Sequence, residues 1–129
     1  MQRTFIAWGA VIMALSVALG AFGAHMLEDK ISAHEMAVYE TGVHYHMIHG
    51  LAVLLTGLAA GLLGESRKLF WAGLLFIFGV FIFSGSLYVL SLSGIKWLGA
   101  ITPIGGVSFI AGWLALAAAA LSGKSGTRA

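Results

Sequence analysis

Histidines are the residues in this sequence with the widest chemical repertoire, and three of them lie close together. His44, His46 and His49 fall in the stretch from Tyr39 to Gly50, and His25 ends the preceding apolar segment. Imidazole can bind a metal ion, transfer a proton near neutral pH or hydrogen-bond a neighbouring side chain. Because residues three apart share one side of a helix, His46 and His49 could hold one metal ion, with His25 as a third ligand.

Several other uses of these histidines stay open. A metal site would lack a carboxylate beside it, and haem ligation would need opposed histidines around a large hollow. A quinone or a lipid could instead be held by histidine and tyrosine donors. The interpretation we favour is structural, with the polar groups satisfying one another and the backbone between helices. The identity of any cofactor is left open.

An enzymatic role is not favoured. The sequence offers no recognisable set of nucleophile, base and orienting group. It contains no cysteine, which excludes thiolate metal sites and haem attached through a C-x-x-C-H motif.

Two stripes of residues recur at helical spacing. The first contains Thr41, Tyr45, His49, Ala52 and Thr56, and the second contains Ser84, Tyr88 and Ser91. A polar stripe facing lipid would leave hydrogen-bonding groups unsatisfied, at a cost on the order of several kcal/mol each. We therefore expect a polar cluster inside a bundle, formed by His25, Thr41, Tyr45, His49, Ser84, Ser86, Tyr88 and Thr102. The remaining polar residues nearby, His34, Glu40 and His44, are expected at a solvated rim.

The elements that position these residues must be membrane helices. Hydrophobic residues make up 60% of the chain and charged residues only 9%, and the mean hydropathy is +0.97. Soluble domains carry about 25% charged residues. The net charge of +2 is small and spread over connectors, so nucleic-acid binding is not indicated. The lipid bilayer is the expected environment.

The pattern predicts a single membrane domain over residues 1–129, an all-α integral membrane four-helix bundle. The expected spans are about 5–27, 45–63, 69–92 and 103–121. An extracytoplasmic amphipathic helix is expected over about 32–44, opened by a capping box of Ser32 and Glu35.

Basic residues predict the orientation of this bundle, because cytoplasmic loops are enriched in lysine and arginine. One side would carry Arg3, Arg67, Lys68, Lys124 and Arg128, and the other only Lys30 and Lys96. Both termini are therefore predicted in the cytoplasm, and the polar cluster in the outer leaflet.

Four motifs occur in order along the chain. They are Gly20-Ala21-Phe22-Gly23-Ala24-His25, then Thr41 with Tyr45 and His49, then Phe83-Ser84-Gly85-Ser86-Leu87-Tyr88, and last Thr102-Pro103-Ile104-Gly105-Gly106 with Phe109, Gly112 and Trp113. In this order they resemble the small four-span inner-membrane family of unknown function typified by the bacterial YgdD and YwdK proteins, which has mitochondrial relatives. The resemblance covers the whole chain. It implies four helices and a multi-pass location in the bacterial plasma (inner) membrane, and it brings no established activity.

The family pattern includes His25, Tyr45, His49, Ser84 and Tyr88. It does not include His34, His44 or His46, which favours His25 with His49 as the pair of interest. We expect a non-enzymatic structural or accessory membrane component. The alternative is a protein that handles a small ligand, a metal or protons through His25 and His49. The many small residues also suit self-association or membership of a larger membrane complex.

Overall fold

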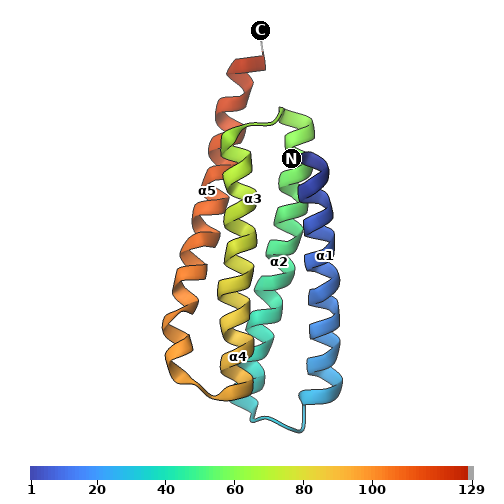
Figure 1. Cartoon of the computed structure of the whole chain (residues 1–129), viewed down its shortest axis with the longest axis vertical. Coiled ribbons are helices and arrows are strands. Elements are labelled where there is room, and N and C mark those ends of the chain that lie inside the picture. The colour runs from blue at the N-terminus through green and yellow to red at the C-terminus, as the bar shows by residue number, and fades with distance from the viewer. Residues whose placement is uncertain (128–129) are drawn as a thin grey trace.

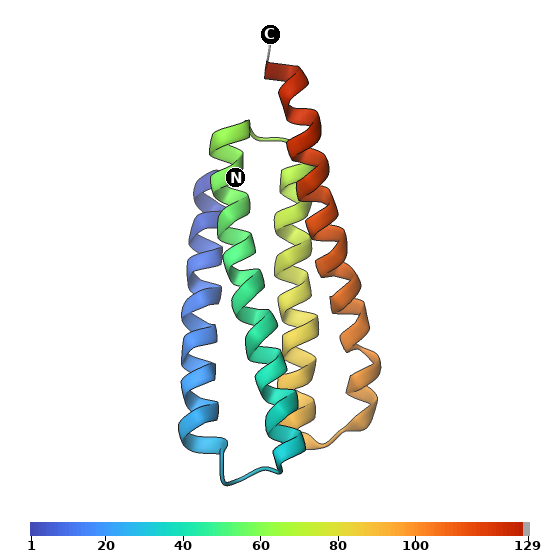
Figure 2. The same cartoon turned by 180° about the vertical axis from the view of Figure 1, so that it is seen from behind.

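The computed structural model describes residues 1–127 of the chain, which form long helices running side by side in alternating directions (Figures 1 and 2). The elements in chain order are α1 (Gln2–Phe22), the π-helical turn η1 (Gly23–Leu27), α2 (Ala33–Leu63), α3 (Arg67–Gly79), the π-helical turn η2 (Val80–Ser84), α4 (Gly85–Ser93), the 3₁₀ turn η3 (Lys96–Ala100) and α5 (Thr102–Thr127). Arg128, counted in the orientation above, lies outside the described residues.

Within residues 1–127, four helical segments are long and apolar enough to cross a membrane, namely Gln2–Leu27, Ala33–Leu63, Arg67–Ser93 and Lys96–Ser122. The prediction of an all-α membrane bundle with four spans is confirmed. The residues expected as an amphipathic helix over about 32–44 are helical from Ala33 and continue without a break into the span, as the first turns of α2. The two parts form one helix because a cap starts it at Ser32 and no proline interrupts it before Leu63.

Local signals in the sequence set the helix ends. The hydroxyl of Ser32 accepts a 3.1 Å hydrogen bond from the Glu35 N–H, and the Glu35 carboxylate accepts a 2.9 Å bond from the Ser32 N–H. These two bonds are the predicted capping box. Ser66 caps α3 through a 3.2 Å bond from the Leu69 N–H. Gly94 ends α4 at a φ of +75°, which glycine adopts without steric cost.

Glycines let the helices approach one another closely at two crossings. A Cβ on Gly9 of α1 would lie 2.5 Å from the backbone nitrogen of Leu54 in α2. A Cβ on Gly105 of α5 would lie 2.5 Å from the backbone nitrogen of Phe83 in η2. Backbone therefore packs on backbone, which is how membrane helices associate in the absence of a hydrophobic driving force.

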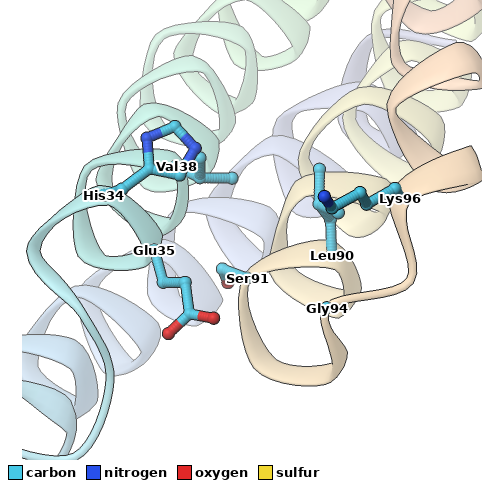
Figure 3. Close-up of a pocket in the computed structure, with 7 residues that line it drawn as sticks. All are labelled: His34, Glu35, Val38, Leu90, Ser91, Gly94 and Lys96. Atoms are coloured by element: carbon cyan, nitrogen blue, oxygen red, sulfur yellow. The ribbon is translucent and has the colours of Figure 1, made fainter.

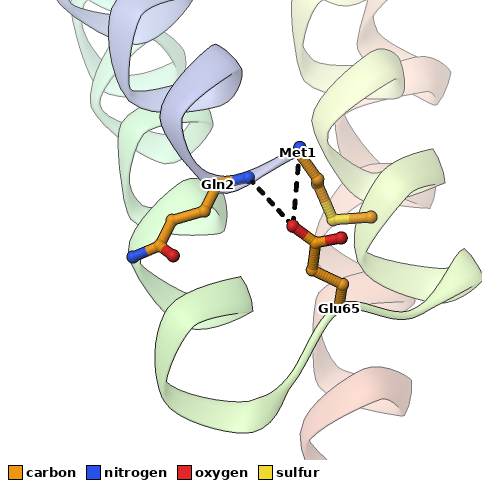
Figure 4. Close-up of polar contacts among 3 residues, drawn as sticks. All are labelled: Met1, Gln2 and Glu65. Atoms are coloured by element: carbon orange, nitrogen blue, oxygen red, sulfur yellow. Dashed lines mark hydrogen bonds and ion pairs between the residues drawn. The ribbon is translucent and has the colours of Figure 1, made fainter.

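The two ends of the bundle differ in what closes them. At the end that carries Met1 and the connector 64–66 (the Met1 end), the N-terminal ammonium lies 3.5 Å from the carboxylate of Glu65 (Figure 4). The opposite end (the Lys96 end) carries the connectors 28–32 and 94–95 together with η3. Between the ends, an apolar core packs around Phe5, Val53 and Phe76.

Candidate functional site

The described structure buries two histidines between the helices, His46 and His49, which are 5% and 4% exposed. They lie on a stripe of buried α2 residues spaced three and four apart: Tyr39, Gly42, His46, His49, Val53, Thr56 and Ala60. This spacing follows the helical repeat and places the stripe against α1 on one side and α3, α4 and α5 on the other.

His46 connects three helices. Its Nε2 lies 2.9 Å from the backbone carbonyl of Ile12 in α1, and its Nδ1 lies 2.8 Å from the hydroxyl of Tyr88 in α4. A carbonyl can only accept, so Nε2 carries the proton and donates it. In the neutral ring Nδ1 then accepts from the Tyr88 hydroxyl, and both nitrogens are engaged.

His49 has the opposite tautomer to His46, with its proton on Nδ1. Its Nδ1 donates to the carbonyl of Tyr45 over 2.9 Å, one turn back in α2. Its Nε2 accepts a 2.9 Å hydrogen bond from the indole N–H of Trp113 in α5, a group that can only donate. His49 is therefore neutral, with its proton on Nδ1. Two histidines three residues apart thus hold opposite tautomers, each set by its partners.

Aromatic rings surround His49. The imidazole stacks on Phe109 with ring centres 3.6 Å apart, and Phe76 and Trp113 each lie 5.7 Å away. The ring of Tyr45 lies 6.1 Å from His49 and nearly parallel to it. Such ring pairs contribute about 0.5–1.5 kcal/mol each beyond their burial.

Other polar side chains tie neighbouring helices to each other through short hydrogen bonds. Tyr39 donates to the Leu19 carbonyl over 2.6 Å, Ser84 to the Gly42 carbonyl over 2.7 Å, and Ser108 to the Leu75 carbonyl over 2.6 Å, while the hydroxyls of Ser86 and Thr102 lie 2.6 Å apart. In the part of the chain that the structure describes, every buried side-chain nitrogen or oxygen has a hydrogen-bond partner.

The structure separates the predicted cluster into parts. Ser84 and Tyr88 bind α2, and Ser86 pairs with Thr102 at the α4–α5 contact. Tyr45 is 39% exposed, although its ring packs 4.7 Å from Phe83. Thr41 is exposed and its hydroxyl bonds the carbonyl of Ala37 in its own helix, so it is not part of a shared cluster.

The structure does not bring His25 to the other histidines. It is exposed, in η1 beyond the point where Gly23 packs on Tyr39. His49 lies about 15 Å further along α2 from Tyr39. The lone pairs of His46 and His49 are also taken by Tyr88 and Trp113. Among the described residues no group of three His, Cys, Asp or Glu side chains could hold a metal ion. The ligand set His25, His46 and His49 is therefore not assembled.

Sequence reasoning missed several of the contact residues. Tyr39 and Ser108 were not singled out, Trp113 appeared only within a motif, and His46 was expected as a metal ligand and not as the partner of Tyr88. The signal for Tyr39 and His46 is the three-and-four spacing that runs from them through His49 to Ala60. No local signal marks Trp113 as the partner of His49, because the two residues lie 64 positions apart.

Comparisons with known proteins agree with this architecture. The chain is 50% identical over 120 residues to a UPF0382 membrane protein of Staphylococcus epidermidis (strain ATCC 12228 / FDA PCI 1200), covering 93% of this chain and 97% of the relative. It is 52% identical over 115 residues to the UPF0382 membrane protein SH2409 of Staphylococcus haemolyticus, covering 89% and 93%. It is 46% identical over 120 residues to the UPF0382 membrane protein YwdK of Bacillus subtilis, covering 93% and 98%. No solved structure matches the chain.

A family profile gives the same assignment. Residues 19–106 match the family described as "Protein of unknown function (DUF423)", a range that contains most of the hydrogen-bonding residues above. The resemblance to the YwdK-type family is thereby confirmed. This chain belongs to the DUF423 family of membrane proteins, whose function is unknown.

Proposed function

We propose that this protein is a non-enzymatic structural or accessory component of the bacterial plasma membrane. The observation that carries the proposal is the internal pairing of His46 and His49, whose four ring nitrogens all bond to groups of the bundle itself. Polar groups that serve catalysis or transport must be open to a substrate for part of the cycle. Here the same groups join α1, α4 and α5 to α2.

The proposed orientation places both termini in the cytoplasm. The support is the distribution of basic side chains, with Arg3, Arg67 and Lys68 at the Met1 end and only Lys30 and Lys96 among lysines and arginines at the other. A plasma-membrane location fits the bacterial relatives, which are named membrane proteins. The pairs His46–Tyr88 and Ser86–Thr102 would then lie toward the outer leaflet.

An accessory role implies association with a partner, either a second copy or a larger membrane complex. The small-residue face of α5 is used within the bundle, where Ala119 is 4% exposed and Ala115 packs against the apolar core, so a partner would meet the exposed apolar side of this helix at Val107, Ile110 and Leu114. Cross-linking in intact membranes, followed by mass spectrometry of the linked species, tests this part of the proposal.

The proposal as a whole is tested by cofactor analysis of gently purified protein. Metal mass spectrometry and organic extraction are applied to the wild type and to the double variant His25→Ala, His49→Ala. We expect neither preparation to hold a stoichiometric metal or quinone, and the variant to unfold at a lower temperature. A metal or quinone that is present in the wild type and lost in the variant would overturn the structural role in favour of ligand handling.

A further inference from the structure

A pocket opens at the Lys96 end of the bundle, between the first turn of α2 and the end of α4 (Figure 3). Its volume is ≈ 260 Å³. Its walls include His34, Glu35 and Val38 of α2 and, across the gap, Leu90, Ser91 and Lys96. The pocket is separate from the hydrogen-bonded histidines described above, since neither His46 nor His49 lines it.

Opposite charges face this pocket from opposite walls. Glu35 extends from α2 and Lys96 from the start of η3 (Figure 3). Among the described residues the recorded ion pair joins Met1 and Glu65, so Glu35 and Lys96 are not paired with each other. One oxygen of Glu35 accepts the capping bond from Ser32, which leaves the second oxygen available. The pocket thus presents an anion on one wall and a cation on the other, with space between them.

The depth of the pocket in the bilayer follows from helix geometry. Leu90 lies about 33 Å along the helix from Lys68, and Val38 lies about 38 Å from Leu63. The hydrocarbon core of a bilayer is about 30 Å thick, and the whole bilayer with its headgroups about 40–45 Å. With the other end of these helices at one membrane surface, the pocket lies in the headgroup layer of the other surface.

A ligand with charges of both signs fits these walls. A purely anionic ligand would place its charge beside Glu35, and a purely cationic ligand beside Lys96, and each contact would be repulsive. Val38 and Leu90 add apolar surface at the same depth. An amphiphile whose headgroup carries both an anion and a cation matches the carboxylate, the ammonium and the apolar surface of the pocket together.

We propose that this pocket binds a phospholipid headgroup that carries a primary ammonium, as phosphatidylethanolamine does. The phosphate is held by Lys96 with His34, and the ammonium donates to the free oxygen of Glu35. The acyl chains leave over Val38 and Leu90 into the bilayer. The site would make a lipid part of the bundle surface, and it goes beyond the structural role proposed above.

The lipid that the protein retains after extraction from a mixed bilayer tests this preference for a headgroup with a primary ammonium. The protein is reconstituted into vesicles of equal parts phosphatidylethanolamine, phosphatidylglycerol and phosphatidylcholine, extracted gently and analysed by native mass spectrometry. We expect phosphatidylethanolamine to be retained about tenfold over the other two, the ratio that corresponds to one charge-assisted hydrogen bond. Phosphatidylglycerol lacks the cation, and the quaternary ammonium of phosphatidylcholine has no N–H to donate.

Two variants assign the preference to the pocket. Glu35→Gln removes the charge but keeps a residue that completes a capping box, so α2 should still start at Ser32. In this variant the three lipids should be retained about equally, because the carboxylate that accepts from the ammonium is gone. Lys96→Gln should lower the retention of all three lipids. Lys30→Gln, a charge loss at the same end of the bundle but outside the pocket, is the matched control and should change nothing.

The outcomes separate the alternatives. Equal retention of the three lipids by the wild type, a preference that survives Glu35→Gln, or unchanged lipid retention in Lys96→Gln would overturn the proposal. Free phosphoethanolamine at millimolar concentration distinguishes a lipid from a soluble zwitterion. If it binds as well as the lipid does, the site takes a soluble molecule and the lipid assignment is wrong. If it neither binds nor displaces the lipid, the assignment is supported.

Discussion

Trp113 donates its indole N–H to Nε2 of His49 across 2.9 Å, and this bond ties α5 to α2. The imidazole is held from its other side by the carbonyl of Tyr45 and is stacked on Phe109. A donor-only group facing Nε2 requires that nitrogen to be unprotonated. The tautomer of His49, with its proton on Nδ1, is therefore set by a residue in a different helix.

Removing that donor should destabilise the bundle. In Trp113→Phe an aromatic ring remains beside Phe76, but the buried Nε2 of His49 loses its partner, which costs about 1–3 kcal/mol. Thermal unfolding in detergent measures the loss. Trp97→Phe changes a side chain that is 65% exposed, and it should leave the unfolding temperature close to that of the wild type. Similar losses for the two variants would show that the bond to His49 contributes nothing.

The hydroxyl of Tyr88 should matter more than that of Tyr45. Tyr88→Phe leaves the buried Nδ1 of His46 without a donor, and we expect the free energy of unfolding to fall by about 1–2 kcal/mol. Tyr45→Phe removes a hydroxyl for which the structure records no hydrogen bond, and the change should stay within about 0.5 kcal/mol. Unfolding titrations in mixed micelles can resolve this difference. The reverse order of effects would place the important tyrosine contact on the other face of α2.

Close approach of α1 to α2 should depend on Gly9. In Gly9→Ala the new methyl would meet the backbone of Leu54, which cannot rotate away, so the helices must separate at a cost of about 1–3 kcal/mol. Gly85→Ala provides the comparison, since a Cβ there would meet no atom of another helix within 4 Å. We expect that variant to unfold at the wild-type temperature or above it. Equal stability of the two variants would mean that the α1–α2 crossing is not as close as described.

Orientation can be tested with single cysteines, because the chain contains none of its own. Ser93→Cys at the Lys96 end should react with a membrane-impermeant maleimide added to intact cells. Ser66→Cys at the Met1 end should react only after the cells are opened. The expectation rests on the excess of lysine and arginine at the Met1 end. Labelling in the opposite order would reverse the proposed topology and place the pocket at Lys96 on the cytoplasmic side.

The sequence predicted correctly those features that depend on residues close together in the chain. The four spans follow from hydrophobic length, and the capping box of Ser32 and Glu35 from residue types three apart, and both are present. The stripe drawn through Thr41 and Tyr45 was less accurate, because steps of four accumulate an angular drift around a helix that turns every 3.6 residues. Both residues consequently lie at the exposed edge of α2, and His46 takes the buried place.

The sequence alone determined that this chain is a four-span membrane protein, because lipid requires long apolar helices whose backbone groups pair internally. It also determined the capping box that starts α2 at Ser32, since a cap acts within a few residues. Only the tertiary structure decided which polar groups meet. His46 bonds Tyr88 across 42 positions and His49 bonds Trp113 across 64, and no pattern within one helix carries that information. The partners depend on how each helix is rotated, and that rotation is set by the close packing at Gly9 and Gly105.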